Sequence, residues 1–316
     1  MPLTLSRRVT GITPSATLAI DARAKALKAQ GQRIIGFAAG EPDFPTPQYI
    51  CDAAREAISL GLTRYTPSSG TPELKQAIVH KLSRDNGLCY TTDQIIVSNG
   101  AKQALLNAFL ALLDPGDEVL LPAPCWVSYP EMIRMAGGVP VFIYTDEAAG
   151  FMPAIDQLAG KLSPRTKAIV VNSPSNPTGC VYPKKLLQEI AAFAVEHGLY
   201  VVSDEIYEQL TYDGSEHVSI AALGDAIKAQ TIVVNGVSKT YAMTGWRIGY
   251  AAGPKDVIRA MDAYQSHATS NPNSIAQYAS TEALKNGETY IRAMREEFDE
   301  RRKLMVDLIN RTEGLS

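Results

Sequence analysis

The sequence is poor in the residue types that mark metal and disulfide proteins. Its 316 residues include only four cysteines and four histidines. The cysteines are Cys51, Cys89, Cys125 and Cys180, and no two of them have the C-x-x-C spacing of a metal or redox site. We therefore expect four reduced thiols and no metal site.

Charge of one sign and long apolar runs are also lacking. The 30 Lys and Arg against 33 Asp and Glu leave a net charge of −3, so no basic field attracts nucleic acid or an anionic membrane. No apolar run is long enough to span a bilayer, and residues 1–11 lack the apolar core of a signal peptide. The sequence predicts a cytoplasmic protein whose partners are small molecules, with no nucleic acid and no membrane among them.

What the sequence does contain is a long alternation of helical and strand-like segments. We expect helices over residues 14–31, 48–61, 71–86, 102–113, 128–137, 183–197, 255–270, 273–286 and 288–311. We expect strands over residues 33–39, 94–98, 118–121, 140–144, 168–172, 200–203, 231–235 and 248–252. Several of these strands are apolar without alternation, which is typical of strands buried on both faces of a parallel sheet. The predicted fold is an α/β three-layer sandwich with a mostly parallel central sheet.

Residues suited to holding a small ligand follow the predicted strands. In open α/β sheets, ligands bind beyond the carboxyl ends of the strands. Gly100, Ala101 and Lys102 open a helix there, where backbone N–H groups can meet a phosphate. Asn176 lies in a proline-rich turn and could present its amide to a ring oxygen. Lys239 follows a buried strand, so its pKa should be lowered and its amine is a candidate nucleophile.

Three further residues suit a flat ring that contains nitrogen. Asp204 could pair with a protonated ring nitrogen, Tyr207 could reach the same ring with its hydroxyl, and Trp126 could stack on its face. Each candidate has an ordinary structural alternative. Asp204 could cap a helix, Tyr207 could be a packed tyrosine, and Trp126 could be a core residue. Likewise, the lysine could reach solvent and the turns could hold no ligand. Together they describe a site for pyridoxal phosphate, and no metal site or hydrolytic triad accounts for the same set.

The motifs that carry these residues resemble those of the class I pyridoxal-phosphate aminotransferases of fold type I, especially the bacterial aspartate aminotransferases. The matching segments are residues 39–44, 65–67, 172–179, 203–207 and 238–249. They occur in the family's order and cover nearly the whole chain. The most specific is Ser-Lys-Thr-Tyr-Ala-Met-Thr-Gly-Trp-Arg-Ile-Gly, which begins at Ser238.

The resemblance implies roles for the residues at matching positions. Lys239 would be the Schiff-base lysine that shuttles the proton, and Asp204 would keep the ring nitrogen protonated. Asn176 and Tyr207 would donate to the phenolic oxygen, with Trp126 stacked on the ring. The phosphate would be held by the backbone of Gly100, Ala101 and Lys102, by Ser238 and Arg247, and by Tyr65 of a second subunit. The chain is therefore expected to form a homodimer with shared active sites.

The same resemblance implies the reaction and the substrates. Lys239, Asp204 and Tyr207 would be the catalytic residues of amino transfer between an amino acid and a 2-oxo acid. Gly40, Lys102, Trp126 and Asn176 would contact the substrate. Lys102 favours a dicarboxylic substrate, aspartate or glutamate, with prephenate possible. The alternatives are a pyridoxal-phosphate lyase on the same fold and a form that binds the cofactor but is catalytically impaired.

The expected domain organisation has three parts. Residues 1–45 would form an N-terminal arm and part of a small domain, and residues 46–286 the large cofactor-binding domain. Residues 287–316 would form a long helix that begins the C-terminal part of the small domain. One face of this helix carries an apolar stripe, which needs a partner surface to pack against. The stripe consists of Ile291, Met294, Phe298, Met305, Leu308 and Ile309. Relatives continue beyond this helix with a segment whose arginine holds the substrate's α-carboxylate, and no residue of this chain is assigned that role.

Overall fold

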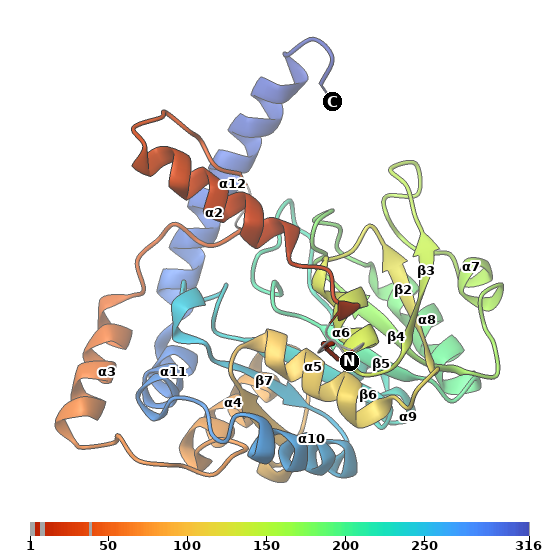
Figure 1. Ribbon diagram of the computed structural model, residues 1–316, viewed down its shortest axis with the longest axis horizontal. Helices are drawn as coiled ribbons and strands as arrows, with labels where there is room; N and C mark the ends of the chain where they lie inside the picture. The colour runs from red at the N-terminus through yellow and green to blue at the C-terminus, as the bar shows by residue number, and fades with distance from the viewer. Residues whose placement is uncertain (1–3, 7–9, 38–39, 316) are drawn as a thin grey trace.

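The computed structural model describes residues 4–6, 10–37 and 40–315, and its centre is one seven-stranded sheet (Figure 1). Its strands are β1 (Ile95–Ser98), β2 (Glu118–Ala123), β3 (Val139–Tyr144), β4 (Thr166–Asn172), β5 (Tyr200–Asp204), β6 (Thr231–Gly236) and β7 (Gly249–Ala252). They lie in the order β1-β7-β6-β5-β4-β2-β3. Only β7 runs antiparallel to its neighbours. The predicted α/β fold with a mostly parallel sheet is confirmed.

Helices cover both faces of this sheet. One face carries α5 (Ala101–Leu112), α6 (Ser128–Met135) and α10 (Lys255–Ala268). The other carries α4 (Pro72–Asn86), α7 (Ile155–Ala159), α8 (Lys184–Glu196), α9 (Asp225–Lys228) and α11 (Ser274–Asn286), with α3 (Gln48–Ser59) packed on α11. The strands contribute to both cores: Ile96 of β1 faces the first layer, whereas Ile95 and Val97 face the second. Burial on both faces explains why their sequences do not alternate.

The carboxyl ends of the parallel strands lie at one edge of the sheet. The parallel strands β4, β5 and β6 end there, and so does β1. Because β7 is antiparallel, its first residue, Gly249, pairs with both Ser98 and Gly236 at this edge. Gly249 has no room for a side chain, since a Cβ would lie 2.0 Å from the backbone nitrogen of Ala101. The absence of a side chain at Gly249 lets the start of α5 pack directly against the start of β7.

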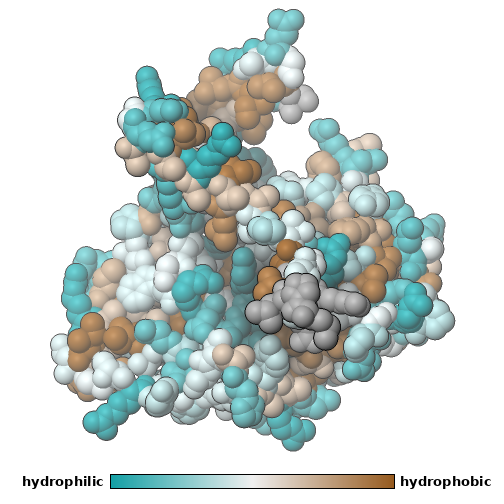
Figure 2. Space-filling model, in the orientation of Figure 1, coloured by the Kyte–Doolittle hydropathy of each residue, from teal (hydrophilic) through white to brown (hydrophobic). Residues whose placement is uncertain are grey.

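Two helices lie at the periphery, α2 (Ala16–Ala29) and α12 (Glu288–Asn310). The first half of the predicted α12 stripe has a partner: Met294 is buried, and Phe298 packs edge-on against Phe44 at 5.2 Å between ring centres. The second half projects from the body (Figure 1), and its apolar side chains are exposed (Figure 2). Over the described residues, no helix combines the length and the apolar character that crossing a membrane requires.

One predicted element is wrong. Residues 33–37 form no strand, and residues 38–39 of the expected strand lie outside the described residues. Ile35 and Phe37 expose most of their side chains. A strand needs a neighbour for its ladder of hydrogen bonds, and none of the seven described strands runs beside this segment. The short helices α7 and α9 were also not expected, because four or five residues are too few to show a helical period.

Candidate active site

Lys239 lies just beyond the end of β6, with its amine turned towards neighbouring loops. Its Nζ donates a hydrogen bond to the Gly40 carbonyl at 2.5 Å and lies 5.8 Å from the centre of the Tyr207 ring. Burial lowers the pKa of this amine; Glu41 raises it and Arg247 lowers it again. The net lowering makes Lys239 easier to deprotonate than a surface lysine, as a nucleophilic amine requires.

Asp204, the last residue of β5, is a buried carboxylate that is 3% exposed. Its Oδ2 accepts a hydrogen bond from the Tyr129 hydroxyl at 2.7 Å, and its Oδ1 accepts one from the Ile206 N–H at 3.2 Å. Burial raises its pKa to about 6, although both hydrogen bonds oppose the rise; Glu205 adds to it. Within the described residues Asp204 has no ion-pair partner, so the site lacks a cation at this point.

Tyr129 is a site residue that our sequence reasoning missed. It lies on α6 and is fully buried, with its hydroxyl on Asp204. Its ring meets the Trp126 ring edge-on at 5.3 Å. No local signal marks it as a site residue, because its partner Asp204 is 75 residues away in the sequence.

The ends of β4 and β5 are tied together by side-chain amides. Asn172 donates through Nδ2 to the Asp204 carbonyl at 3.0 Å and accepts the Asn176 N–H on its Oδ1 at 2.8 Å. The Asn176 Nδ2 in turn lies 3.5 Å from the Tyr207 hydroxyl. Asn172, which was not predicted as a site residue, therefore places Asn176 beside Tyr207. The pair offers an amide and a phenol to one acceptor.

The start of α5 and Arg247 form an anion-binding corner. Gly100 adopts a φ of 84°, and a Cβ there would lie 2.2 Å from Arg247 Nη2. Arg247 itself has a left-handed φ of 57° and donates to the carbonyls of Thr244 and Asn99 at 2.9 and 3.3 Å. The first N–H groups of α5 have no partner within a helix, so they and the guanidinium can meet the same anion.

Comparison with known proteins identifies the family. The sequence pattern of the family "Aminotransferase class I and II" matches residues 32–316. The chain belongs to this family. Aspartate aminotransferase of Geobacillus stearothermophilus is 52% identical over 312 residues, which are 99% of this chain and 79% of that protein. Aspartate/prephenate aminotransferase of Thermus thermophilus is 51% identical over 306 residues, 96% of this chain and 78% of that protein.

Solved structures of aspartate aminotransferases have the same fold as this aminotransferase. The structure of Thermus thermophilus aspartate aminotransferase with maleate has a TM-score of 0.94 and is 50% identical, covering 97% of this chain and 80% of that one. The Rhizobium meliloti aspartate aminotransferase has a TM-score of 0.95 at 44% identity, covering 99% and 78%. The predicted family and fold are confirmed, and amino transfer is favoured over the lyase alternative.

In this aminotransferase the other predicted residues lie in different surroundings. Lys102 Nζ lies 4.8 Å from the centre of the Trp126 ring, and its pKa is lowered by burial and then by Arg247. Ser238 is buried beside Lys239 in sequence. Tyr65 is 91% exposed and takes part in none of the contacts described above. The chain therefore gathers one set of predicted residues at the sheet edge and presents Tyr65 to the outside.

Proposed function

We propose that this aminotransferase uses pyridoxal phosphate to move an amino group between a dicarboxylic amino acid, aspartate first, and a 2-oxo acid. The observation that carries the proposal is the buried Asp204 carboxylate, which has no cation beside it among the described residues, on the sheet edge that also bears the half-buried Lys239. A protonated ring nitrogen would give the Asp204 carboxylate a positively charged partner. The cofactor's aldehyde would bind covalently to the Lys239 amine.

The donor set fits the cofactor at both of its ends. The corner formed by Gly100 and Arg247 suits a phosphate, because it combines free helix N–H groups with a guanidinium that lies close to the Gly100 backbone. Ser238 and the backbone of Ala101 and Lys102 would add donors there. Asn176 and Tyr207 would hold the phenolic oxygen, and Trp126 would cover the ring.

The chain's own residues account for the steps around the cofactor. When bound, pyridoxal phosphate withdraws electrons from the substrate's α-carbon. Lys239, whose pKa is lowered, would hold or release the transferred proton at Nζ. Asp204 would keep a proton on the ring nitrogen, and its own hydrogen bonds fix the direction of its carboxylate. Catalysis would then depend on Lys239 as the base and on Asp204 as the partner of the ring nitrogen.

The substrate class rests on Lys102 and on the relatives. The curated proteins that match this chain are named aspartate or aspartate/prephenate aminotransferases. Lys102 supports the same choice, because its ammonium, 4.8 Å from the centre of the Trp126 ring, would pair with a second carboxylate. Gly40, whose carbonyl accepts a hydrogen bond from Lys239 Nζ, would line the same side of the substrate. We propose aspartate and glutamate as the amino donors.

A spectrum tests the cofactor assignment. Wild-type protein mixed with pyridoxal phosphate should show the visible band of cofactor bound covalently to a lysine, and Lys239→Ala should lose it. Lys228→Ala is the matched control, because Lys228 is also partly buried but lies at the opposite end of β6. A band that survives in Lys239→Ala, or disappears in the control, would contradict the assignment.

Turnover tests the reaction. Aspartate with 2-oxoglutarate should give glutamate, and aspartate alone should give no more than one equivalent of oxo acid per site. Ammonia released continuously without an oxo-acid acceptor would instead indicate a lyase.

We further propose a homodimer in which Tyr65 reaches the phosphate of the other subunit. Its exposure supports this arrangement, since a phenol offered to solvent can serve a partner's site. The division into residues 1–45, 46–286 and 287–316 remains part of the same proposal.

A further inference from the structure

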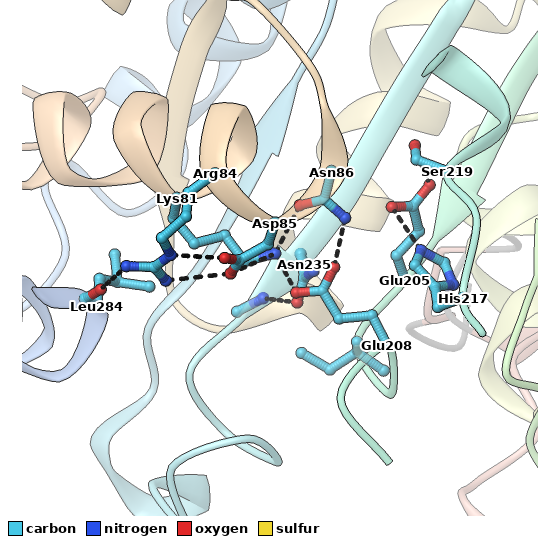
Figure 3. Close-up of polar contacts among 12 residues, drawn as sticks. Lys81, Arg84, Asp85, Asn86, Glu205, Glu208, His217, Ser219, Asn235 and Leu284 are labelled. Atoms are coloured by element: carbon cyan, nitrogen blue, oxygen red, sulfur yellow. Dashed lines mark hydrogen bonds and ion pairs between the residues drawn. The ribbon is translucent and has the colours of Figure 1, made fainter. Parts of the chain in front are cut away.

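The turn after β5 places buried glutamates directly behind the candidate site residues. Asp204 and Tyr207 belong to the site, and each is followed at once by a glutamate, Glu205 or Glu208. Glu205 is 1% exposed and Glu208 is 5% exposed. Carboxylates are rarely buried so fully unless they are paired. Figure 3 shows that both are paired, with residues that our account of the site does not use.

Glu205 is held by three donors. Its Oε1 accepts hydrogen bonds from the hydroxyls of Ser203 and Ser219 at 2.8 and 2.7 Å. Its Oε2 lies 3.1 Å from His217 Nε2. Burial lowers the pKa of His217, but the hydrogen bond and charge of Glu205 outweigh it and raise that pKa overall. The pair therefore favours a charged imidazole against a charged carboxylate.

Glu208 is held by the last turns of α4. It accepts hydrogen bonds from Lys81 Nζ and, at 2.6 Å, from Asn86 Nδ2 (Figure 3). Lys81 also donates to Asn86 Oδ1 at 2.7 Å and lies 3.8 Å from Asp85. Lys81 is itself almost completely buried. Breaking its pairing with Glu208 would weaken its charge compensation in the interior.

These contacts leave no place for a metal ion. Glu205, Glu208 and His217 offer ligand atoms within 4.8 Å of one another. Both carboxylates, however, already accept hydrogen bonds: Glu208 from Lys81 and Asn86, and Glu205 from Ser203 and Ser219. Glu208 is paired with Lys81 and Glu205 with His217, so each carboxylate already has a cationic partner from the chain.

We propose that Glu205 and Glu208 are positioning residues that hold Asp204 and Tyr207 against the cofactor. This inference rests on the proposed function. The turn is short, with the Glu208 N–H donating to the Glu205 carbonyl at 3.0 Å. If this turn rotated and moved Asp204 or Tyr207, it would also pull Glu205 away from His217 or Glu208 away from Lys81. The cost of unpairing these charges keeps the two site residues in place.

The test compares three glutamate-to-glutamine variants. Glu205→Gln and Glu208→Gln remove the charge but keep the size of the side chain. Glu118→Gln is the matched control, because Glu118 is also buried and is held by Ser163 at 2.5 Å and by Arg165 at 2.6 Å. It begins β2, so it lies at the edge of the sheet opposite the site.

The readouts report the cofactor's surroundings and not only stability. We measure the dissociation constant of pyridoxal phosphate and the pH midpoint of its visible band. Removing residues that orient a ligand-holding side chain typically weakens binding about 10- to 100-fold at metal sites, and we expect about tenfold here. The band's pH midpoint should shift in both site variants, whereas Glu118→Gln should match wild type in both measurements.

The outcomes separate the possible failures. A wild-type band with an unchanged dissociation constant and pH midpoint in both site variants overturns this inference alone. No band in wild type overturns the proposed function, and the inference with it. If the site variants fail to fold, Ser219→Ala and Asn86→Ala each remove a single donor from the same glutamates. Cofactor binding identical to wild type in both of those variants also overturns the inference.

Discussion

At the scale of single residues, Asp204 is a carboxylate kept in an unfavourable place. Burial raises its pKa from 3.8 to about 6, and one pKa unit is worth about 1.4 kcal/mol. In the cofactor-free protein, the free energy of unfolding therefore falls by about 3 kcal/mol as the pH rises from below 4 to above 6, because the folded state resists ionisation. If the proposed cofactor binds, its protonated ring nitrogen would offset that cost.

We therefore predict that Asp204→Asn stabilises the cofactor-free protein in a pH-dependent way. The gain over wild type should be near zero at pH 4 and should reach up to about 3 kcal/mol at pH 8, where wild-type Asp204 is ionised. Urea unfolding of both proteins at the two pH values measures it. The same substitution should weaken cofactor binding. A gain equal at both pH values would show that charge is not the cause.

At the scale of elements, Gln265 of α10 joins the loop that carries Tyr65 to the end of β1. It is 0% exposed, and its Nε2 donates to the carbonyls of Ser68 and Val97 at 2.7 and 2.8 Å. Its Oε1 accepts a hydrogen bond from the Ser98 hydroxyl at 2.6 Å. Ser68 belongs to the loop that carries Tyr65, and Ser98 lies two residues before Gly100. One amide thus links the loop of Tyr65 to the anion-binding corner.

Replacing this amide should cost much of the protein's stability. Gln265→Leu keeps the volume but leaves several buried polar groups without partners, each worth about 1–3 kcal/mol. We expect the free energy of unfolding to fall by at least about 3 kcal/mol in urea titrations. Gln157→Leu is the control: this glutamine is exposed, caps α7 and should cost less than about 1 kcal/mol. If both variants lost the same free energy of unfolding, the buried hydrogen bonds of Gln265 would contribute no more to stability than the exposed cap.

The elements were predictable from sequence where local pattern decides them. The apolar runs of β4, β5 and β6 and the capped helices needed no knowledge of the fold, and strand ends pointed to Asp204 and Lys239. Contacts between distant residues were not predictable. Tyr129 reaches Asp204 across 75 residues of sequence, and Gln265 reaches Ser98 across 167. Such pairs depend on how layers pack, which no window of sequence records.

At the scale of the whole molecule, Tyr65 is an exposed aromatic residue on an ordered loop. Its loop is fixed from inside by Gln277, which accepts the Thr71 N–H at 2.8 Å and donates to the Thr66 hydroxyl at 3.1 Å. Tyr65 nevertheless exposes 91% of its surface. An ordered loop that carries an exposed phenol is well suited to a contact with a second copy. In a symmetric dimer each subunit would then supply Tyr65 to the other.

Mixed dimers decide this. In a hybrid of Lys239→Ala and Tyr65→Ala subunits with sites shared across the interface, one site carries both defects and the other is wild type. If the two variants are mixed equally and reassembled at random, half the dimers are hybrids, so about a quarter of wild-type activity should return. If Tyr65 served its own subunit, every site would carry one defect and mixing would restore nothing. Size exclusion of the mixture before the assay confirms that dimers are what is measured.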